Sequence, residues 1–117
     1  MSNPARPAPG ALLARLEDAP DGAAIVVDFR QATALFSLIL ARRGDAIFAY
    51  ENRCPHAGFP LERPDGRVHV QAGGFLVCSA HGASFALESG ACAGGPGNGR
   101  GLTPIAVRVE NGAILMA

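Results

Sequence analysis

Two short segments of the sequence each combine a cysteine with a histidine. The first is Cys54-x-His56 and the second is Cys78-x-x-His81, and residues 57–77 separate them. Thiolate and imidazole are side-chain ligands that proteins use for zinc, iron and other borderline-soft metals. Because the chain contains only three cysteines and three histidines, this concentration of both residue types predicts one metal centre with four ligands.

The mixed composition of the two segments favours a two-iron centre over a zinc finger. Structural zinc sites usually pair cysteine with cysteine and histidine with histidine, above a helix. Here each segment supplies one ligand of each kind, and the neighbouring Pro55, Gly58 and Gly82 favour tight turns. Such segments suit a centre in which one iron takes two cysteines and the other takes two histidines. A structural zinc module is the alternative.

The rest of the chain has the composition of an all-β domain. Apolar residues make up 49% and charged residues 17%, and there are 15 glycines and 9 prolines, which favours short elements joined by tight turns. We predict a strand at 23–29 and a hairpin over 34–50 that turns at Gly44–Asp45. A second hairpin should turn at Asn111–Gly112, because this pair suits a type I′ turn.

Length and local composition predict one domain, residues 1–117. Residues 1–10 contain three prolines and are expected to be a flexible leader, whereas residues 12–16 fit either a strand or a helical turn. Residues 51–103 are irregular and rich in glycine and proline, so a bound metal is expected to hold them. We expect an enlarged hairpin within this region, turning at Asp65–Gly66.

Charge and hydropathy exclude several classes of protein. The formal net charge is zero, which gives no electrostatic reason to bind nucleic acid or an anionic membrane. The longest apolar run, residues 32–41, is too short for a bilayer span of about 20 residues. No secretory signal is visible at the N-terminus. Together these features predict a soluble, cytoplasmic protein whose cysteines are thiols or metal ligands rather than disulfides.

Further residues extend the pattern into a family resemblance. Together with HGASF at 81–85 and ESGACAGGP at 88–96, the two segments resemble the Rieske [2Fe–2S] family, and in particular its soluble ferredoxins. The resemblance implies an all-β Rieske fold. In that fold, a small antiparallel β-sandwich or barrel-like base carries an inserted cluster-binding subdomain of loops and short strands.

The same resemblance implies the ligands of the cofactor, one [2Fe–2S] cluster per chain. Cys54 and Cys78 would bind one iron, and His56 and His81 would bind the other. Gly95–Pro96 would belong to a third loop that covers the cluster.

The resemblance also implies the function. The protein would be a low-potential ferredoxin that carries single electrons between a reductase and a terminal oxygenase or a similar enzyme. It would act as a monomer and would have no catalytic residues. Once His56 and His81 are assigned to the cluster, only His69 remains, and one histidine is too few for the separate iron site of a Rieske oxygenase. The alternative is a small Rieske subunit of a multi-component oxidoreductase, similar to that of nitrite reductase.

Several other residues receive structural interpretations. Cys92 is expected to be a buried or half-buried small hydrophobic residue, and His69 to face solvent. Four arginines are expected to be solvated charges in turns: Arg42, Arg43, Arg63 and Arg67. Three large apolar residues near the motif are expected to cover the cluster or to join the core: Phe59, Leu61 and Phe75.

Polar groups missing from the motif predict a low reduction potential. High-potential Rieske proteins join their cluster loops by a disulfide and place Ser and Tyr hydroxyls near the cluster. The matching positions here hold Phe59 and Ala80 for the disulfide, and Ala83 and Phe85 for the hydroxyls. Because hydrogen bonds to sulfur stabilise the reduced cluster, a redox titration should give roughly −150 mV, and a value of about +300 mV would contradict this account.

Overall fold

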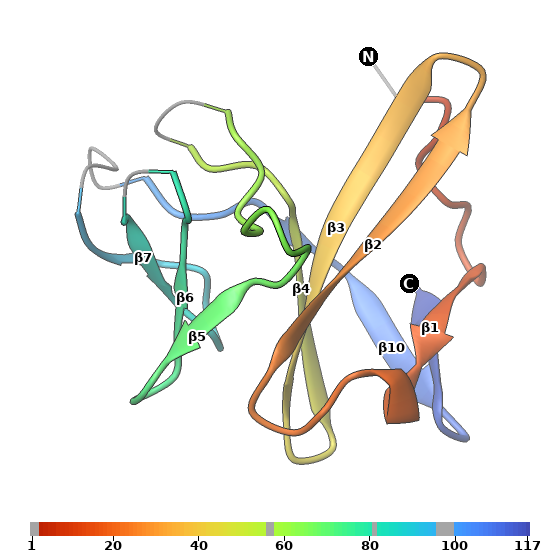
Figure 1. Cartoon of the computed structure of the whole chain (residues 1–117). Coiled ribbons are helices and arrows are strands. Elements are labelled where there is room, and N and C mark those ends of the chain that lie inside the picture. Colours follow the sequence, from red (N-terminus) through yellow and green to blue (C-terminus); the bar gives the residue numbers. More distant parts are fainter. Residues whose placement is uncertain (1–2, 56–57, 81, 96–99) are drawn as a thin grey trace.

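The structure is a computed structural model that describes residues 3–55, 58–80, 82–95 and 100–117. These residues form eleven strands and one short 3-10 helix, η1 (Figure 1). The elements are β1 (Leu12–Arg15), η1 (Leu16–Asp18), β2 (Ala24–Gln31), β3 (Ala34–Arg43), β4 (Ala46–Glu51), β5 (His69–Gln71), β6 (Phe75–Val77), β7 (Ser84–Ala86), β8 (Cys92–Gly94), β9 (Pro104–Ile105), β10 (Val107–Glu110) and β11 (Ala113–Met116).

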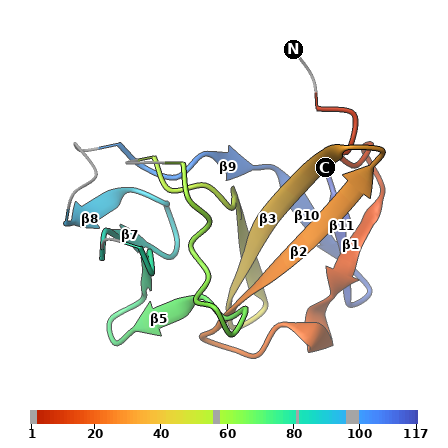
Figure 2. The same cartoon turned by 45° about the horizontal axis from the view of Figure 1, so that its top comes forward.

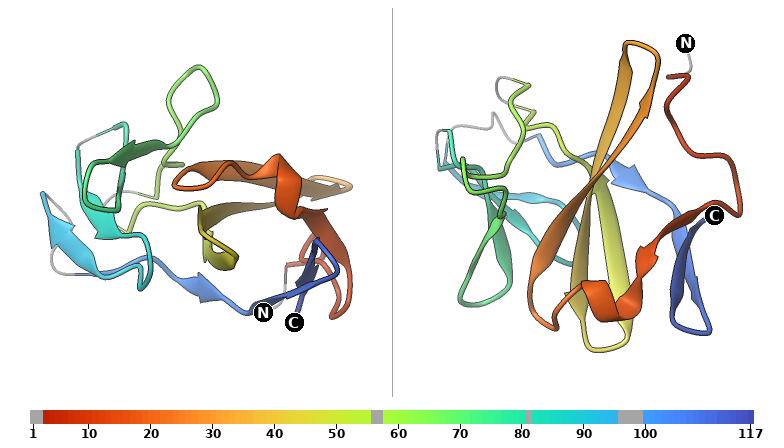
Figure 3. Two further views of the ribbon diagram at one scale, coloured as in Figure 1. Left: turned by 90° about the horizontal axis from the view of Figure 1, so that it is seen from below. Right: turned by 45° about the vertical axis from the view of Figure 1, so that its right-hand side comes forward.

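The strands form three antiparallel sheets. Their orders are β1-β11-β10, β2-β3-β4-β9 and β5-β6-β7-β8. In Figures 1 and 2 the β2-β3-β4-β9 sheet lies between the other two, and both views of Figure 3 keep this order. The β5–β8 sheet falls between β4 and β9 in the sequence, so it is an insertion into the central sheet. The all-β base with an inserted subdomain of loops and short strands is therefore confirmed.

Strand β3 connects the two hydrophobic cores. Phe36, Leu38 and Leu40 belong to the cluster shared with β1, β10 and β11. Ile39 and Ala41 belong to the other cluster, which includes residues of the β5–β8 sheet. Because successive side chains of a strand point to opposite faces, β3 is buried on both sides. This double burial explains why its sequence is a nearly continuous apolar run instead of an alternating one.

The turns that define the two predicted hairpins are confirmed. The last pair between β3 and β4 is Arg43 with Ala46, which leaves Gly44–Asp45 as the two-residue turn. Between β10 and β11, Asn111 has φ +49° and Gly112 has φ +77°. Both residues thus adopt the positive φ that a type I′ turn requires.

The N-terminal region contacts the base. The sequence predicted a flexible leader at residues 1–10, but Ala5 is buried in the core of the base. Asn3 Nδ2 donates a hydrogen bond to Leu35 O (2.8 Å), and Gly10 N–H donates to Met116 O (2.7 Å). Residues 3–10 therefore pack against the sheets by specific contacts.

Residues 12–16, for which the sequence fitted either a strand or a helical turn, contain a strand that leads into a helical turn. It is strand β1 as far as Arg15, and the next three residues form η1. The N–H of Arg15 donates to Asp18 Oδ2 (2.9 Å), which caps the start of this turn. As η1 is the one helical segment in the described residues, no helix of this part of the chain could cross a membrane.

The predicted role of Arg42 is wrong. It was expected to be a solvated turn charge, but its guanidinium is half-buried and binds three backbone carbonyls. Nη1 donates to Leu16 O (3.2 Å) and Ala19 O (3.0 Å), and Nε donates to Gly44 O (2.7 Å). Arg42 thus fastens the segment after β1 to the β3–β4 turn.

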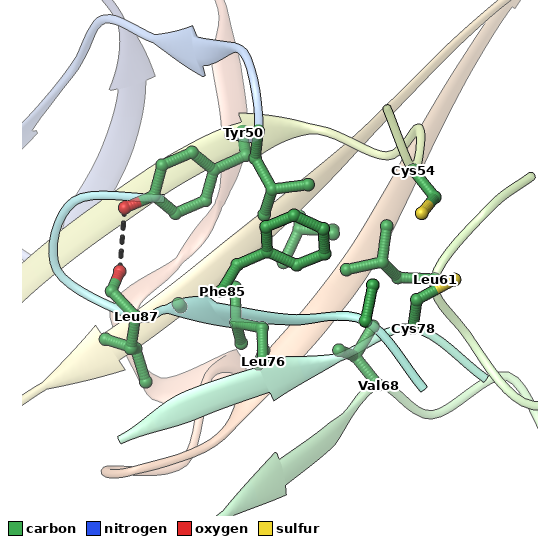
Figure 4. Packing of buried hydrophobic residues seen from close by; sticks show 13 residues of the cluster. Tyr50, Cys54, Leu61, Val68, Leu76, Cys78, Phe85 and Leu87 are labelled. Carbon is green, nitrogen blue, oxygen red and sulfur yellow. Dashed lines mark hydrogen bonds between the residues drawn. The ribbon is translucent and has the colours of Figure 1, made fainter. Parts of the chain in front are cut away.

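Tyr50, in β4, joins the central sheet to the inserted sheet. Its hydroxyl donates a buried hydrogen bond to Leu87 O (2.7 Å; Figure 4). A Cβ at position 90 would lie 2.6 Å from Tyr50 Cε1, so only glycine leaves room for the ring there. Burial, with a smaller contribution from the Glu88 carboxylate, raises the pKa of Tyr50 from 10.0 to about 12.

The elevated pKa of Tyr50 is directly measurable because the chain contains one tyrosine. Tyrosinate absorbance of the folded protein should rise with a midpoint near 12, whereas a midpoint at the ordinary 10.0 would contradict the buried hydrogen bond. The folded-state pKa lies above the unfolded one, so the contribution of Tyr50 to stability is complete below pH 10 and is lost as pH approaches 12. Tyr50→Phe should remove the titration and cost about 1–3 kcal/mol in denaturant unfolding, since Leu87 O loses its donor.

Candidate metal centre

The first predicted ligand segment is a closed loop that follows β4. The N–H of Cys54 donates to Phe59 O, and the N–H of Gly58 donates back to Cys54 O, both at 2.7 Å. Gly58 has φ +75°, a conformation that other residues adopt only with strain. The cysteine therefore stands at the neck of the loop with both of its backbone polar groups hydrogen-bonded.

The second segment has the same hydrogen-bond pattern. The N–H of Cys78 donates to Ala83 O (2.8 Å), and the N–H of Gly82 donates to Cys78 O (3.0 Å). Gly82 has φ +76°, almost the value at Gly58. In both loops the bonded glycine is four residues after the cysteine and the accepting carbonyl is five residues after it. The structure thus brings the two predicted cysteine ligands into equivalent local environments.

Both cysteine side chains are buried in one apolar cluster. Cys54 and Cys78 are each 1% exposed, and they share that cluster with Leu61, Leu76 and Phe85. In the view of Figure 4 the two cysteines lie next to Leu61, at the end of the cluster away from Tyr50. No disulfide joins the cysteines of the chain. Because a buried thiolate is unfavourable unless a cation compensates its charge, a pair of thiols placed in this way suits a metal centre.

The two predicted histidine ligands lie outside the described residues. His56 follows Pro55, and His81 stands between Ala80 and Gly82 in sequence. Within the described part of the chain, no group of three or more His, Cys, Asp or Glu side chains could hold a metal ion. The structure shows where the two cysteines lie, and the assignment of all four residues as ligands stays a prediction.

Hydrogen bonds also join the second loop to the segment that follows the first. The N–H of Ser79 donates to Leu61 O (3.2 Å), and the hydroxyl of Ser79 donates to Glu62 O (2.8 Å). Ser79 directly follows Cys78 in the sequence. Residues 61 and 62 are therefore hydrogen-bonded to the direct neighbour of the second cysteine.

Asn52 is a site residue that the sequence did not reveal. Its side-chain Oδ1 accepts from the N–H of Leu61 (2.8 Å), and its Nδ2 donates to Ser37 Oγ (3.0 Å) and Glu62 Oε1 (2.6 Å). Asn52 stands two residues before Cys54 in a stretch rich in turn-forming residues, where an asparagine usually indicates a turn. Only the three-dimensional contacts distinguish it from such a residue.

The third loop lies against the second. Gly95 has φ +78°, and a Cβ there would come within 2.8 Å of Ala83 Cα and 2.9 Å of Gly82 O. This contact agrees with the expectation that Gly95 covers the centre. Pro96, the other residue named for this role, lies outside the described residues.

The residues at the positions matched to the missing disulfide and hydroxyls differ in exposure. Ala83 and Phe85 are fully buried in the cysteine-containing cluster, whereas Phe59 is 52% exposed. Neither buried side chain can donate a hydrogen bond to a group bound between the loops. The interpretations of three further residues are also confirmed: Leu61 joins the core, Cys92 is half-buried against the same cluster, and His69 is exposed.

A hollow of about 560 Å³ opens beside the first loop. Cys54, Pro55 and Gly58 line one part of it, and the exposed Arg53 and Arg100 line another. The loop that carries Cys54 is therefore accessible from solvent on this side, although the thiol itself is buried.

One protein family matches the chain. Residues 12–110 match the family model of the Rieske [2Fe-2S] domain, which is most of the 117 residues. A search of the curated proteins found no matching protein.

Several solved structures share the fold. The ferredoxin of carbazole 1,9a-dioxygenase from Nocardioides aromaticivorans IC177 is 22% identical with a TM-score of 0.75, over 94% of this chain and 98% of that one. The Sphingomonas yanoikuyae B1 ferredoxin is 24% identical with a TM-score of 0.70, over 92% and 96%. A putative small subunit of NADPH nitrite reductase is 18% identical with a TM-score of 0.65, also over 92% and 96%. At these identities the similarity shows a common fold.

The close approach at Gly95 predicts a specific effect of substitution. Gly95→Ala should lower stability by more than the backbone cost of about 1–2 kcal/mol, because the new methyl group overlaps Ala83 and Gly82. It should also speed the release of bound metal to a chelator. Gly66→Ala is the matched control, since Gly66 has φ +84° with no atom within 4 Å of the added Cβ. Equal effects of the two variants would show that the third loop does not protect the centre.

Proposed function

Because this chain belongs to the Rieske [2Fe-2S] domain family, we propose that it is a low-potential Rieske-type ferredoxin. It carries single electrons between a reductase and a terminal oxygenase or a similar enzyme. Its cofactor is one [2Fe–2S] cluster per chain. The observation that carries this proposal is the pair of equivalent loops whose cysteines, Cys54 and Cys78, are buried in one cluster.

The donor set fits this cofactor. Cys54 and Cys78 supply two buried sulfur ligands for one iron, and the loops that carry them have identical hydrogen-bond patterns. We propose that His56 and His81, the remaining members of the two motifs, bind the other iron. Two thiolates and two neutral imidazoles match the ligand set of a Rieske centre.

The residues around the two cysteines favour electron transfer with little structural change. When bound, the cluster accepts and releases one electron at a time. The chain holds the sulfur ligands nearly fixed, because each loop is closed by two backbone hydrogen bonds and Ser79 joins the second loop to residues 61–62. Leu61, Ala83 and Phe85 exclude water from the cysteine side. Arg53, Arg100 and one carboxylate, Glu51, line the hollow beside the first loop. The hollow therefore presents a net positive charge to an approaching partner.

The oxygenase partner is supported by similarity. The similar protein from Nocardioides aromaticivorans is a ferredoxin of carbazole 1,9a-dioxygenase, and this chain covers 98% of its length. We propose that the present protein acts in the same way, as a soluble cytoplasmic monomer that transfers electrons and catalyses no reaction of its own. Its partners are redox proteins, not nucleic acids or membranes.

The second candidate is a small subunit held permanently in a multi-component oxidoreductase. The similarity to a putative small subunit of NADPH nitrite reductase favours it. Size-exclusion chromatography of the protein purified from its native cells distinguishes the two. A free carrier elutes as a monomer, and a subunit elutes with its larger partner.

Cysteine variants test the proposal. Cys54→Ser and Cys78→Ser should each abolish iron and acid-labile sulfide binding, because a serine oxygen replaces a sulfur ligand. Cys92→Ser is the matched control and should retain the cluster, since Cys92 is half-buried and its Sγ contacts only Gly94 O (3.9 Å) among the hydrogen bonds of the described residues.

The same samples should be titrated for electron uptake. The wild-type protein and Cys92→Ser should take up and release one electron per chain reversibly, and the other two variants should take up none. Full iron content in Cys54→Ser or Cys78→Ser would refute the ligand assignment. Zinc in the wild-type protein, without sulfide, would refute the electron-carrier function.

A further inference from the structure

Asn52 is the one buried amide side chain among the described residues. It is 8% exposed, and its carboxamide makes three hydrogen bonds, to Ser37 Oγ, to Glu62 Oε1 and from the N–H of Leu61. Its backbone N–H also donates to Ser37 O (2.9 Å). The carboxamide therefore bonds to a base strand, β3, and to the segment that follows the first cysteine loop.

The hydrogen bonds of Asn52 close the first cysteine loop from outside. Asn52 precedes that loop and Leu61 follows it, so the 2.8 Å bond between them fixes both ends of the segment that contains Cys54. This bond is independent of the two backbone bonds inside the loop. The bond to Ser37 Oγ adds a connection to the base, whose core packing holds β3.

The same network continues to the second loop. Leu61 and Glu62, which contact the Asn52 side chain, use their carbonyl oxygens to accept hydrogen bonds from Ser79. Ser79 directly follows Cys78. A continuous path of hydrogen bonds therefore runs from β3 through Asn52 and residues 61–62 to the neighbour of the second cysteine.

We propose that Asn52 is a positioning residue for the cluster: through residues 61–62 and Ser79 it sets the separation of the two cysteine loops. It thereby determines how firmly the cluster is held and contributes to its reduction potential. This inference rests on the proposed function, since it requires that Cys54 and Cys78 bind the cluster. Groups that fix the ligands of a metal site commonly influence its affinity and potential without touching the metal.

A neutral carboxamide is well suited to this position. It supplies one acceptor for the N–H of Leu61 and donors for Glu62 and Ser37 from a single planar group. A leucine of similar size could fill the space but would leave the buried N–H of Leu61 unsatisfied. An aspartate would keep that acceptor but would place its charge against the Glu62 carboxylate.

Two variants and a matched control test the inference on the cluster-loaded protein. Asn52→Leu removes all three side-chain bonds at nearly constant volume. Ser79→Ala removes only the bond to Glu62 O and keeps the rest of the network. The control is Asn3→Leu, because Asn3 also joins two segments through its carboxamide, to Leu35 O and from the N–H of Ala5. Among the described residues it makes no hydrogen bond to the cysteine loops or to residues 61–62. The measurements are iron release to a chelator, the midpoint potential and the EPR spectrum of the reduced protein.

Asn52→Leu should release iron about 10- to 100-fold faster than the wild-type protein. Its remaining intact cluster should show a shifted midpoint potential and altered g-values, which a loss of global stability alone would not produce. Ser79→Ala should change the same quantities in the same direction by a smaller amount. Asn3→Leu should leave all three unchanged, even if it lowers the unfolding midpoint in denaturant.

Wild-type release rates, potential and spectrum in both Asn52→Leu and Ser79→Ala would overturn the positioning role. If Asn52→Leu does not fold, Ser79→Ala decides the outcome alone. Equal effects in Asn3→Leu would also overturn it, because any weakening of the base would then suffice. A normal cluster in the wild-type protein with unaffected variants contradicts only this inference, whereas a wild-type protein without iron and sulfide contradicts the proposed function as well.

Discussion

The placement of the two cysteines depends most on the two backbone hydrogen bonds that close each cysteine loop. In both loops the N–H and the C=O of the cysteine are bonded within the loop, to Phe59 and Gly58 in one and to Ala83 and Gly82 in the other. These bonds hold each cysteine at the neck of its loop, and the apolar cluster buries the side chain. The positive φ of the two glycines is what allows the chain to return so tightly.

The sandwich base serves as the fixed support for these loops. Strand β3 is buried on both faces, so it belongs to the core of the base and to the cluster that contains the cysteines. Two hydrogen-bonding residues then connect the base to the inserted region. Tyr50, near the end of β4, donates to Leu87 O, and Asn52, which follows β4, bonds to residues 61–62. Buried hydrogen bonds and the apolar cluster shared by both parts therefore join the inserted subdomain to the base. A rigid connection of this kind keeps the ligands still when the charge of the bound group changes.

The sequence predicted those features that are encoded locally. The Cys-x-His and Cys-x-x-His segments identified the family, and Gly44–Asp45 and Asn111–Gly112 located two hairpins, since turn chemistry acts over a few residues. The sequence predicted a hairpin in the inserted region that turns at Asp65–Gly66. The chain does turn there, where the N–H of Arg63 donates to Arg67 O, but the hairpin of the β5–β8 sheet turns at residues 72–74. Strands of three residues are too short for their pattern to locate the pairing. The roles of Arg42 and Asn52 also depend on partners distant in sequence, and the same holds for the packing of residues 3–10 against the base. Local patterns do not contain such contacts.

The EPR spectrum of the dithionite-reduced wild-type protein tests the central claim most directly. If two cysteines hold one iron and two histidines the other, the spectrum should be an anisotropic signal with the low average g of a half-histidine cluster. The signal should account for one electron spin per chain. An EPR-silent sample that contains one zinc per chain, or the signal of a cluster held by cysteine alone, would contradict the account.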